Sequence, residues 1–227
     1  MDPSLIARRW DEEYRRGRYV DEPPLPFVGA IMRVLADEPA ARAGVGLYVG
    51  CGNGRNYLPL VDAGLSLVGL DVSPEAIERL GEHRPAVRSR LTCQDFREFD
   101  PDARRFDYLI ALQVFQHGDA ADAVAYFDKA RRVLRPGGLF FLRVNASTTE
   151  IYHAHTVTER LPTGAFTIRY DDGPKRGLLV HFYSAIELHA LAGSDFALVI
   201  EPAEQVTRRT PPKAGCWSQW EAVWRRV

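Results

Sequence analysis

The sequence has little of what marks a secreted, metal-binding or nucleic-acid-binding protein. It contains three cysteines in 227 residues, and Cys51, Cys93 and Cys216 lie too far apart for a disulfide framework or a zinc-ligand pattern. Its 29 basic and 30 acidic residues give a formal net charge of −1 and form no basic block that would follow a phosphate backbone. The sequence therefore predicts a chain of a reducing compartment with no nucleic-acid partner.

Long apolar runs, repeats and low-complexity tracts are also missing. No stretch approaches the roughly 18 apolar residues of a membrane span, and residues 1–4 do not begin a basic and then apolar leader segment. Hydrophobic residues make up 46% of the chain, enough for one well-buried domain. We therefore expect a soluble, cytoplasmic protein with a single domain over residues 1–227 and no membrane contact. The oligomeric state stays open.

The most informative stretch is a glycine-rich segment between two apolar runs. The first run leads into Gly50, Gly52 and Gly54, and the second ends at Asp71. Glycine allows positive φ and lets a ligand approach the main chain. Asp71 follows Gly50 by 21 positions, where the second strand of a βαβ unit ends and a carboxylate can accept from both ribose hydroxyls. The pattern predicts a site for an adenosine-containing ligand.

The hydrophobic pattern predicts an α/β fold. Apolar runs alternate with amphipathic segments, which is typical of a doubly wound (Rossmann-like), mostly parallel sheet with helices on both faces. The helix expected over 120–134 would bury Val124, Phe127, Ala130 and Leu134. The seven expected strands are 45–49, 67–71, 91–96, 106–112, 139–144, 196–201 and 218–225.

The spacing of the glycines separates two classes of cofactor site. The dinucleotide fingerprint is G-x-G-x-x-G, but here the third glycine comes one residue early and Arg55 stands in its place. With this G-x-G-x-G segment and the Leu-Arg-Pro-Gly-Gly run at 134–138, the chain resembles the class I S-adenosylmethionine-dependent methyltransferases. Gly-Asn-Gly-Arg-Asn at 52–56 and Trp-Asp-x-x-Tyr at 10–14 are similar to the small-molecule, tellurite/thiopurine-type branches.

The resemblance implies an antiparallel last strand, S-adenosyl-L-methionine as cofactor and S-adenosyl-L-homocysteine as product. It also implies in-line transfer of the methyl group to an O, N or S atom of a small molecule. Residues 1–27 would form a lid segment whose Trp10 and Tyr14 cover the cofactor. The cofactor-binding residues would be Trp10, Tyr14, Gly50, Gly52, Gly54, Asn56, Asp71, Val72, Asp95, Phe96 and Gln113.

Some of these assignments have plainer alternatives. Trp10 and Tyr14 follow Ile6 at helical spacing and could form a packing stripe. Asp95, which the resemblance places at the adenine amine, could cap a loop. Two other functions also stay open, namely a nicotinamide-dependent (NAD(P)) oxidoreductase and a non-catalytic, S-adenosylmethionine-binding partner subunit.

The acceptor side is expected around an insertion at residues 146–183. Two strand-like runs at 166–170 and 178–183 predict an inserted β-hairpin. His117 follows the fourth strand and is the candidate general base, although it could instead cap the next helix. No carboxylate or cysteine joins the histidines at ligand spacing, so we expect no metal. The predicted substrate-binding residues are Phe27, His117, Tyr152, His181, Tyr183 and Trp217.

Overall fold

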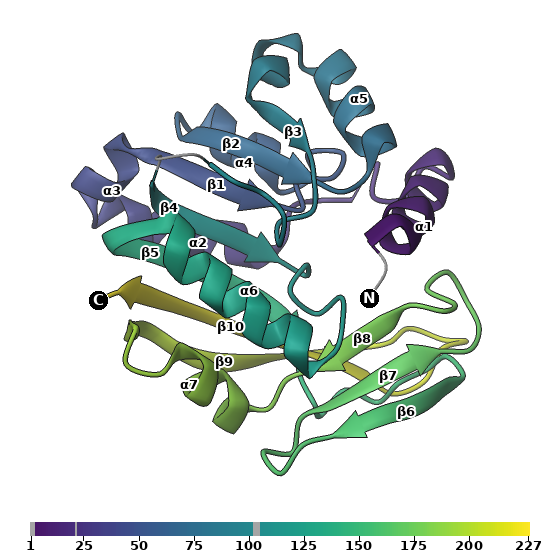
Figure 1. Cartoon of the computed structure of the whole chain (residues 1–227). Coiled ribbons are helices and arrows are strands. Elements are labelled where there is room, and N and C mark those ends of the chain that lie inside the picture. Colours follow the sequence, from purple (N-terminus) through teal and green to yellow (C-terminus); the bar gives the residue numbers. More distant parts are fainter. Residues whose placement is uncertain (1–2, 21, 102–104) are drawn as a thin grey trace.

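The main feature of the fold is a seven-stranded sheet with the order β3-β2-β1-β4-β5-β10-β9 (Figure 1). The computed structural model describes residues 3–20, 22–101 and 105–227. Strands β1 to β5 pair in parallel, whereas β10 runs antiparallel to both β5 and β9. The strands of this sheet are β1 (Val45–Val49), β2 (Ser66–Asp71), β3 (Leu91–Cys93), β4 (Phe106–Leu112), β5 (Leu134–Asn145), β9 (Phe196–Arg208) and β10 (Cys216–Arg226). The predicted mostly parallel sheet with an antiparallel last strand is confirmed.

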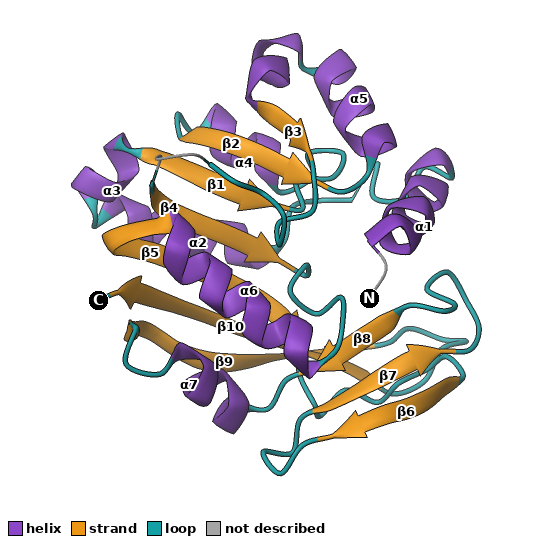
Figure 2. Ribbon diagram, in the orientation of Figure 1, coloured by secondary structure: helices purple, strands orange, loops and turns teal. Residues whose placement is uncertain are grey.

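Helices cover both faces of this sheet (Figure 2), as predicted. Side chains alternate across a strand, so Leu47 and Val49 of β1 pack with α6 and α7, and Tyr48 between them packs with the helices of the other face. The helices are α1 (Pro3–Arg15), α2 (Pro26–Ala36), α3 (Pro39–Ala43), α4 (Tyr57–Asp62), α5 (Pro74–His83), α6 (Ala120–Val133) and α7 (Ala185–Ala192), with a short 3₁₀ helix at Pro85–Arg90.

Helix α6 packs on the sheet with a different stripe from the one predicted. Asp119 caps its first turn by accepting from the backbone N–H of Asp122. From this start the buried positions are Ala123, Tyr126, Phe127, Ala130 and Val133. Val124 is 49% exposed, so its assignment to the stripe was wrong, and Leu134 is buried as the first residue of β5.

The strand order reverses between β1 and β4. Helix α1 lies over the carboxyl ends of the strands at this point (Figure 1). In open α/β sheets this reversal leaves a crevice at the carboxyl ends of the strands. Asp11 of α1 binds Ser73, which begins α5, and Arg15 pairs with Glu75 at 3.1 Å. Arg79 of α5 donates to the Tyr14 carbonyl at 2.7 Å. These contacts fix α1 over the carboxyl ends of the central strands.

A second, three-stranded antiparallel sheet lies at the same edge of the molecule (Figure 1). It consists of β6 (His155–Arg160), β7 (Phe166–Tyr170) and β8 (Leu179–Phe182). The predicted hairpin corresponds to β7 and β8, and the structure adds β6, whose side chains alternate between half-buried and exposed. Ile168, Val180 and Phe182 form its own small apolar cluster.

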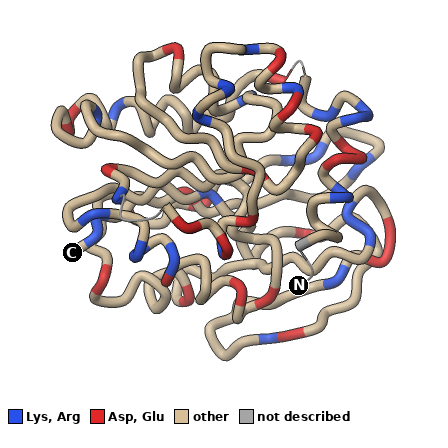
Figure 3. Tube along the Cα trace, turned by 45° about the horizontal axis from the view of Figure 1, so that its top comes forward, with Lys and Arg blue, Asp and Glu red and all other residues tan. Residues whose placement is uncertain are grey.

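Acidic and basic residues are interspersed along the whole described trace (Figure 3). None of the helices in the described part of the chain is long and apolar enough to cross a bilayer.

Candidate active site

The glycine loop after β1 needs glycine at two positions for steric reasons. Gly50 has φ 75° and Gly52 has φ 52°, values that L side chains rarely adopt. A Cβ on Gly50 would overlap Val114, and one on Gly52 would lie 2.5 Å from the Tyr14 hydroxyl oxygen. The main chain therefore runs directly under the lid helix α1 and beside the segment after β4.

Gly54 has a different role from the one predicted. Its φ is 94°, and a Cβ would lie 2.7 Å from Leu80 Cδ1 and 2.8 Å from Leu58 Cγ. These neighbours belong to α5 and α4, and Gly54 is absent from the described lining of the pocket. The absence of a side chain at Gly54 allows α4 and α5 to pack closely against the loop. We therefore withdraw the assignment of Gly54 to cofactor contact.

Asp71, at the end of β2, holds the glycine loop through its carboxylate. Oδ2 accepts from the Gly52 N–H at 2.8 Å and Oδ1 accepts from the Ser73 N–H at 2.9 Å. The residue is 7% exposed, and burial raises the pKa of the carboxyl to about 6 even though these amides oppose the shift. A carboxylate has about four lone-pair sites, so Asp71 can still accept a hydrogen bond from a ligand in the pocket.

These residues line a pocket between α1 and the carboxyl ends of β1, β2 and β4. Ten of the eleven predicted cofactor residues line it, all except Gly54. Trp10 and Tyr14 also pack against each other, with ring centres 5.9 Å apart, as the stripe interpretation expects, and the lid interpretation stays a prediction. Sequence reasoning missed several lining residues that tertiary packing brings in, including Ile6, Tyr19, Cys51 and Tyr126.

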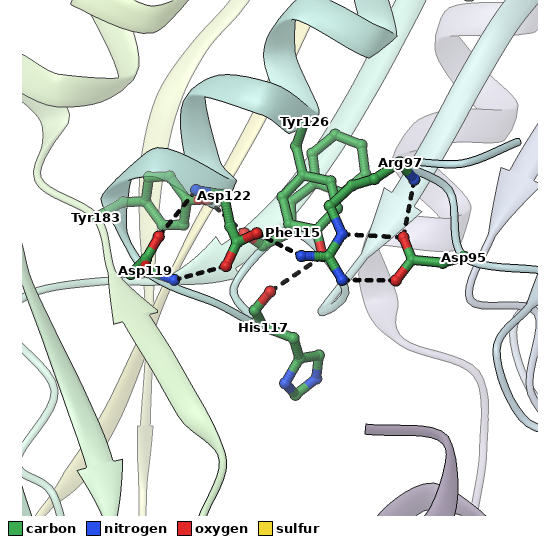
Figure 4. Close-up of polar contacts among 8 residues, drawn as sticks. All are labelled: Asp95, Arg97, Phe115, His117, Asp119, Asp122, Tyr126 and Tyr183. Atoms are coloured by element: carbon green, nitrogen blue, oxygen red, sulfur yellow. Dashed lines mark hydrogen bonds and ion pairs between the residues drawn. The ribbon is translucent and has the colours of Figure 1, made fainter. Parts of the chain in front are cut away.

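Asp95 is engaged by an arginine inside the protein (Figure 4). Its two oxygens accept from Arg97 Nε at 3.0 Å and Nη2 at 2.7 Å, and Arg97 also binds Asp122. The guanidinium carbon lies 5.7 Å from the centre of the Tyr126 ring. Asp95 is therefore fixed at the pocket wall by a bidentate pair, which leaves its Oδ2 one lone pair for a ligand.

Gln113 and His117 come from the segment after β4. Gln113 has φ 63°, an unusual value for a non-glycine residue and one often found at binding sites. His117 is 4% exposed, and neither ring nitrogen has a hydrogen-bond partner among the described residues. Its ring lies 5.5 Å from that of Trp10, and its carbonyl accepts from the Tyr126 hydroxyl. The helix cap belongs to Asp119, so the capping alternative for His117 is wrong.

The electrostatic surroundings of His117 limit its basicity. Burial lowers the pKa of its imidazole to about 3, and the positive charge of Lys175 adds to this shift. The imidazole is therefore neutral at neutral pH, with one nitrogen able to donate a hydrogen bond and the other able to accept one. Figure 4 shows the ring pointing away from the Asp95–Arg97–Asp122 network.

A second pocket adjoins the first and shares Trp10 and Tyr19 with it. It lies between α1, the β6–β8 sheet and the strand β10, and Tyr152 and Trp217 line it, so their role in substrate binding stays a prediction. Asn145 accepts from Trp217 Nε1 at 3.1 Å, which fixes the indole in the wall. The two pockets are therefore neighbours, with Trp10 and Tyr19 in the lining of both.

Three predicted substrate residues lie outside both pockets. Phe27 is buried in the core under α2. His181 is fully buried between Thr167 and Glu187, with its ring nitrogens 2.9 Å from each. Tyr183 is also fully buried and donates to the Phe115 carbonyl. These side chains serve packing and internal hydrogen bonding, and we withdraw their assignment to the acceptor.

The residues of the first pocket fit a nucleoside cofactor. Asp71 supplies ribose acceptors, the glycine loop leaves a cradle that a Cβ would fill, and His117 offers two unpaired buried nitrogens. A dinucleotide fits less well, because Arg55 fills the position of the third glycine and its guanidinium binds Glu22 at 2.9 Å.

Comparisons with known proteins agree with this geometry. Residues 47–138 match the family model described as a methyltransferase domain. The ubiquinone biosynthesis O-methyltransferase of Cereibacter sphaeroides (strain ATCC 17029 / ATH 2.4.9) is 33% identical over 121 residues. That match covers 51% of this chain and 41% of the relative, so the chain spans less than half of the relative's length.

Solved structures share the fold over nearly the whole chain. The 1,6-didemethyltoxoflavin-N1-methyltransferase of Burkholderia thailandensis gives a TM-score of 0.66 at 20% identity, covering 99% of this chain and 88% of that one. TehB from Haemophilus influenzae gives 0.63 at 15% identity, with 96% and 67% covered. At such identities the likeness establishes the fold alone. The chain is thus similar to methyltransferases in two respects, the domain matched over residues 47–138 and the fold of nearly the whole chain.

Proposed function

We propose that the protein transfers the methyl group of S-adenosylmethionine to a nucleophilic O, N or S atom of a small molecule. The observation that carries this proposal is the pair of joined pockets, with the cofactor residues in the first and an aromatic-walled space next to it. Trp10 and Tyr19 stand where the pockets meet, so both ligands would approach each other under α1. The partner-subunit alternative does not explain why the second pocket is open.

Different residues of the first pocket would hold different parts of the cofactor. Asp71 would accept from the ribose hydroxyls, Asp95 from the adenine amine, and Val72 and Phe96 would pack on the purine. When bound, the cofactor supplies an activated methyl group on a sulfonium. The protein's own part is to hold both partners in line and exclude water, which can contribute on the order of 7–11 kcal/mol.

Incubation with S-adenosylmethionine and a panel of small phenols, amines and thiols tests the proposed activity. Formation of S-adenosylhomocysteine should depend on the presence of one acceptor class. The single-domain boundaries, the lid at 1–27, the insertion at 146–183 and the cytoplasmic location stay predictions.

The affinity for S-adenosylhomocysteine should fall as the pH is lowered through about 6. Burial raises the pKa of Asp71 to about 6, so below that pH the carboxyl is protonated and loses acceptor capacity toward the ribose. Calorimetric titration from pH 8 to pH 5 should show a plateau above about pH 7 and a decline below it. The Asp71→Asn variant, which cannot ionise, should show weak binding without this decline, and an equal decline in that variant would assign the effect elsewhere.

His117 should contribute to methyl transfer through its neutral imidazole. We expect His117→Ala to slow the reaction more than tenfold at saturating cofactor, because its two unpaired nitrogens lie in the first pocket beside Trp10, which both pockets share, and can hydrogen-bond a reacting group there. Since burial lowers the pKa of His117 to about 3, the wild-type rate should show no inflection near pH 6.5 from this group. His189→Ala, on the outer face of α7, is the matched control. A loss below threefold for His117→Ala would rule out a catalytic role.

A further inference from the structure

The second pocket is strongly cationic in a chain that is almost neutral. Its lining carries five basic side chains and one carboxylate, that of Glu13, which leaves a formal charge of +4 against −1 for the whole chain. Along the described trace as a whole, acidic and basic residues are interspersed (Figure 3). The basic residues are Arg9, Arg18, Lys175, Arg209 and Lys213.

Within the part of the chain that the structure describes, the arginines of this pocket have hydrogen-bond or ion-pair partners, whereas its two lysines form no ion pair. Arg9 pairs with Glu12 at 3.1 Å, Arg18 with Glu13 at 3.9 Å, and Arg209 donates to the Ala214 carbonyl. Across the described residues, no carboxylate lies within 4.0 Å of either lysine ammonium. Lys175 Nζ instead lies 5.9 Å from the Trp10 ring centre, and Lys213 Nζ lies 5.7 Å from that of Tyr152.

Lys175 stands at the junction of the two pockets. It extends from the β7–β8 connection toward Trp10, which both pockets share. Its positive charge also contributes to lowering the pKa of His117 in the first pocket. Burial lowers the pKa of its ammonium to about 8, with Arg18 adding to the shift and Glu13 opposing it. Removing the Lys175 ammonium from water costs free energy unless a negative charge lies beside it. An anionic ligand in the pocket would provide that negative charge.

The walls between these cations are flat and aromatic. Tyr152 and Trp217 are 49% and 37% exposed, and both line the second pocket, so part of each side chain is accessible to a ligand there. Phe182, which the fold buries almost completely, also lines this pocket. Aromatic rings with cations at their edges suit a planar ligand that carries negative charge.

We propose that the acceptor is a planar aromatic molecule with an anionic group, which binds the second pocket with that group at Lys175. This inference rests on the proposed methyltransferase function and names its substrate class. The ring stacks among the tyrosine and tryptophan side chains, and Lys213 and Arg209 add to the positive potential at the outer end. The charge of the ligand replaces the carboxylate partner that the lysines lack within the protein.

Calorimetric titration of the protein saturated with S-adenosylhomocysteine tests this proposal. The probes are matched pairs of equal shape, salicylate with salicylamide and 3-hydroxy-2-naphthoate with 3-hydroxy-2-naphthamide. At least one carboxylate should bind ten or more times as tightly as its amide, and this ratio should shrink when NaCl is raised from 50 to 500 mM. Lys175→Met should lower carboxylate binding about tenfold and leave amide binding unchanged. Lys129→Met, on α6 and outside both pockets, is the matched control and should change neither.

Several results would overturn the proposal. It fails if no carboxylate binds more tightly than its amide. It also fails if Lys175→Met weakens S-adenosylhomocysteine as much as it weakens the carboxylate, because the lysine would then serve the cofactor. In both of these cases the wild-type protein still binds S-adenosylhomocysteine, so the proposed methyltransferase function is not affected. A wild type that does not bind it overturns the methyltransferase function itself, and this inference with it.

Discussion

Replacing Asp71 with alanine should weaken S-adenosylhomocysteine binding by a factor of at least about one hundred. Hydrogen bonds to a charged acceptor contribute about 1.5–3 kcal/mol each, and the ribose offers two hydroxyls. The variant also loses the acceptor that fixes the Gly52 and Ser73 amides, so the glycine loop would be less well ordered for binding. Isothermal titration at pH 7.5 measures the affinity directly.

The loss of binding by Asp71→Ala should not come from unfolding. Because burial raises the folded-state pKa of Asp71 to about 6, the ionised carboxylate opposes folding above that pH, and its removal offsets the lost amide bonds. The control is Asp107→Ala, which removes a carboxylate that accepts from the Val45 N–H at 2.7 Å outside both pockets. That variant should lose stability and keep its affinity. Equal affinity losses in the two variants would contradict the assigned role of Asp71.

Gly50→Ala should be the most damaging substitution in the glycine loop. Its φ of 75° disfavours any Cβ by roughly 1–2 kcal/mol, and overlap with Val114 adds about 1–3 kcal/mol. We expect the free energy of unfolding to fall by about 2–5 kcal/mol and the affinity for S-adenosylhomocysteine to fall more than tenfold. Urea denaturation and calorimetry measure the two effects.

Two further variants separate the two causes of the Gly50 effect. Gly137 has a similar φ of 78° but open space around it. Gly137→Ala should therefore lower the free energy of unfolding only by the cost of the backbone conformation, and it should leave the affinity for S-adenosylhomocysteine unchanged. Val114→Ala removes the methyl groups that Gly50→Ala would meet. The double variant should therefore recover part of the lost stability. If Gly50→Ala costs no more than Gly137→Ala, the close approach of the loop to Val114 is incorrect.

Much of the sheet could be predicted because its strands are buried on both faces. The ranges 45–49 and 106–112 coincide with β1 and β4, where short, almost unbroken apolar runs are typical of buried parallel strands. Strand β6 was missed because the sequence from His155 to Arg160 is polar and its alternation is weak. The buried face of α6 was predicted wrongly because Ala123 and Val124 are both apolar. Only the start of the helix, set by the cap at Asp119, decides which of the two faces the core.

The candidate site was predictable where its residues follow directly from strands. Asp71, Asp95 and Gln113 each come shortly after a strand of the parallel sheet, so topology alone brings them to one edge. The acceptor side depends on tertiary packing that no spacing encodes. His181 in β8 and Tyr183 just after it are polar or amphipathic by type but are buried in the core. Lys175 lies in a turn-rich connection, and the fold brings its ammonium to the Trp10 ring.

A parallel calorimetric titration of the wild-type protein with S-adenosylhomocysteine and with NAD tests the central claim most directly. The claim is that the loop of Gly50 and Gly52, with Asp71, holds the methyl donor. It predicts micromolar binding of S-adenosylhomocysteine and no measurable binding of NAD, because Arg55 stands where a dinucleotide site needs its third glycine. Clear binding of NAD with none of S-adenosylhomocysteine would contradict it, and the loop would then be a variant dinucleotide site.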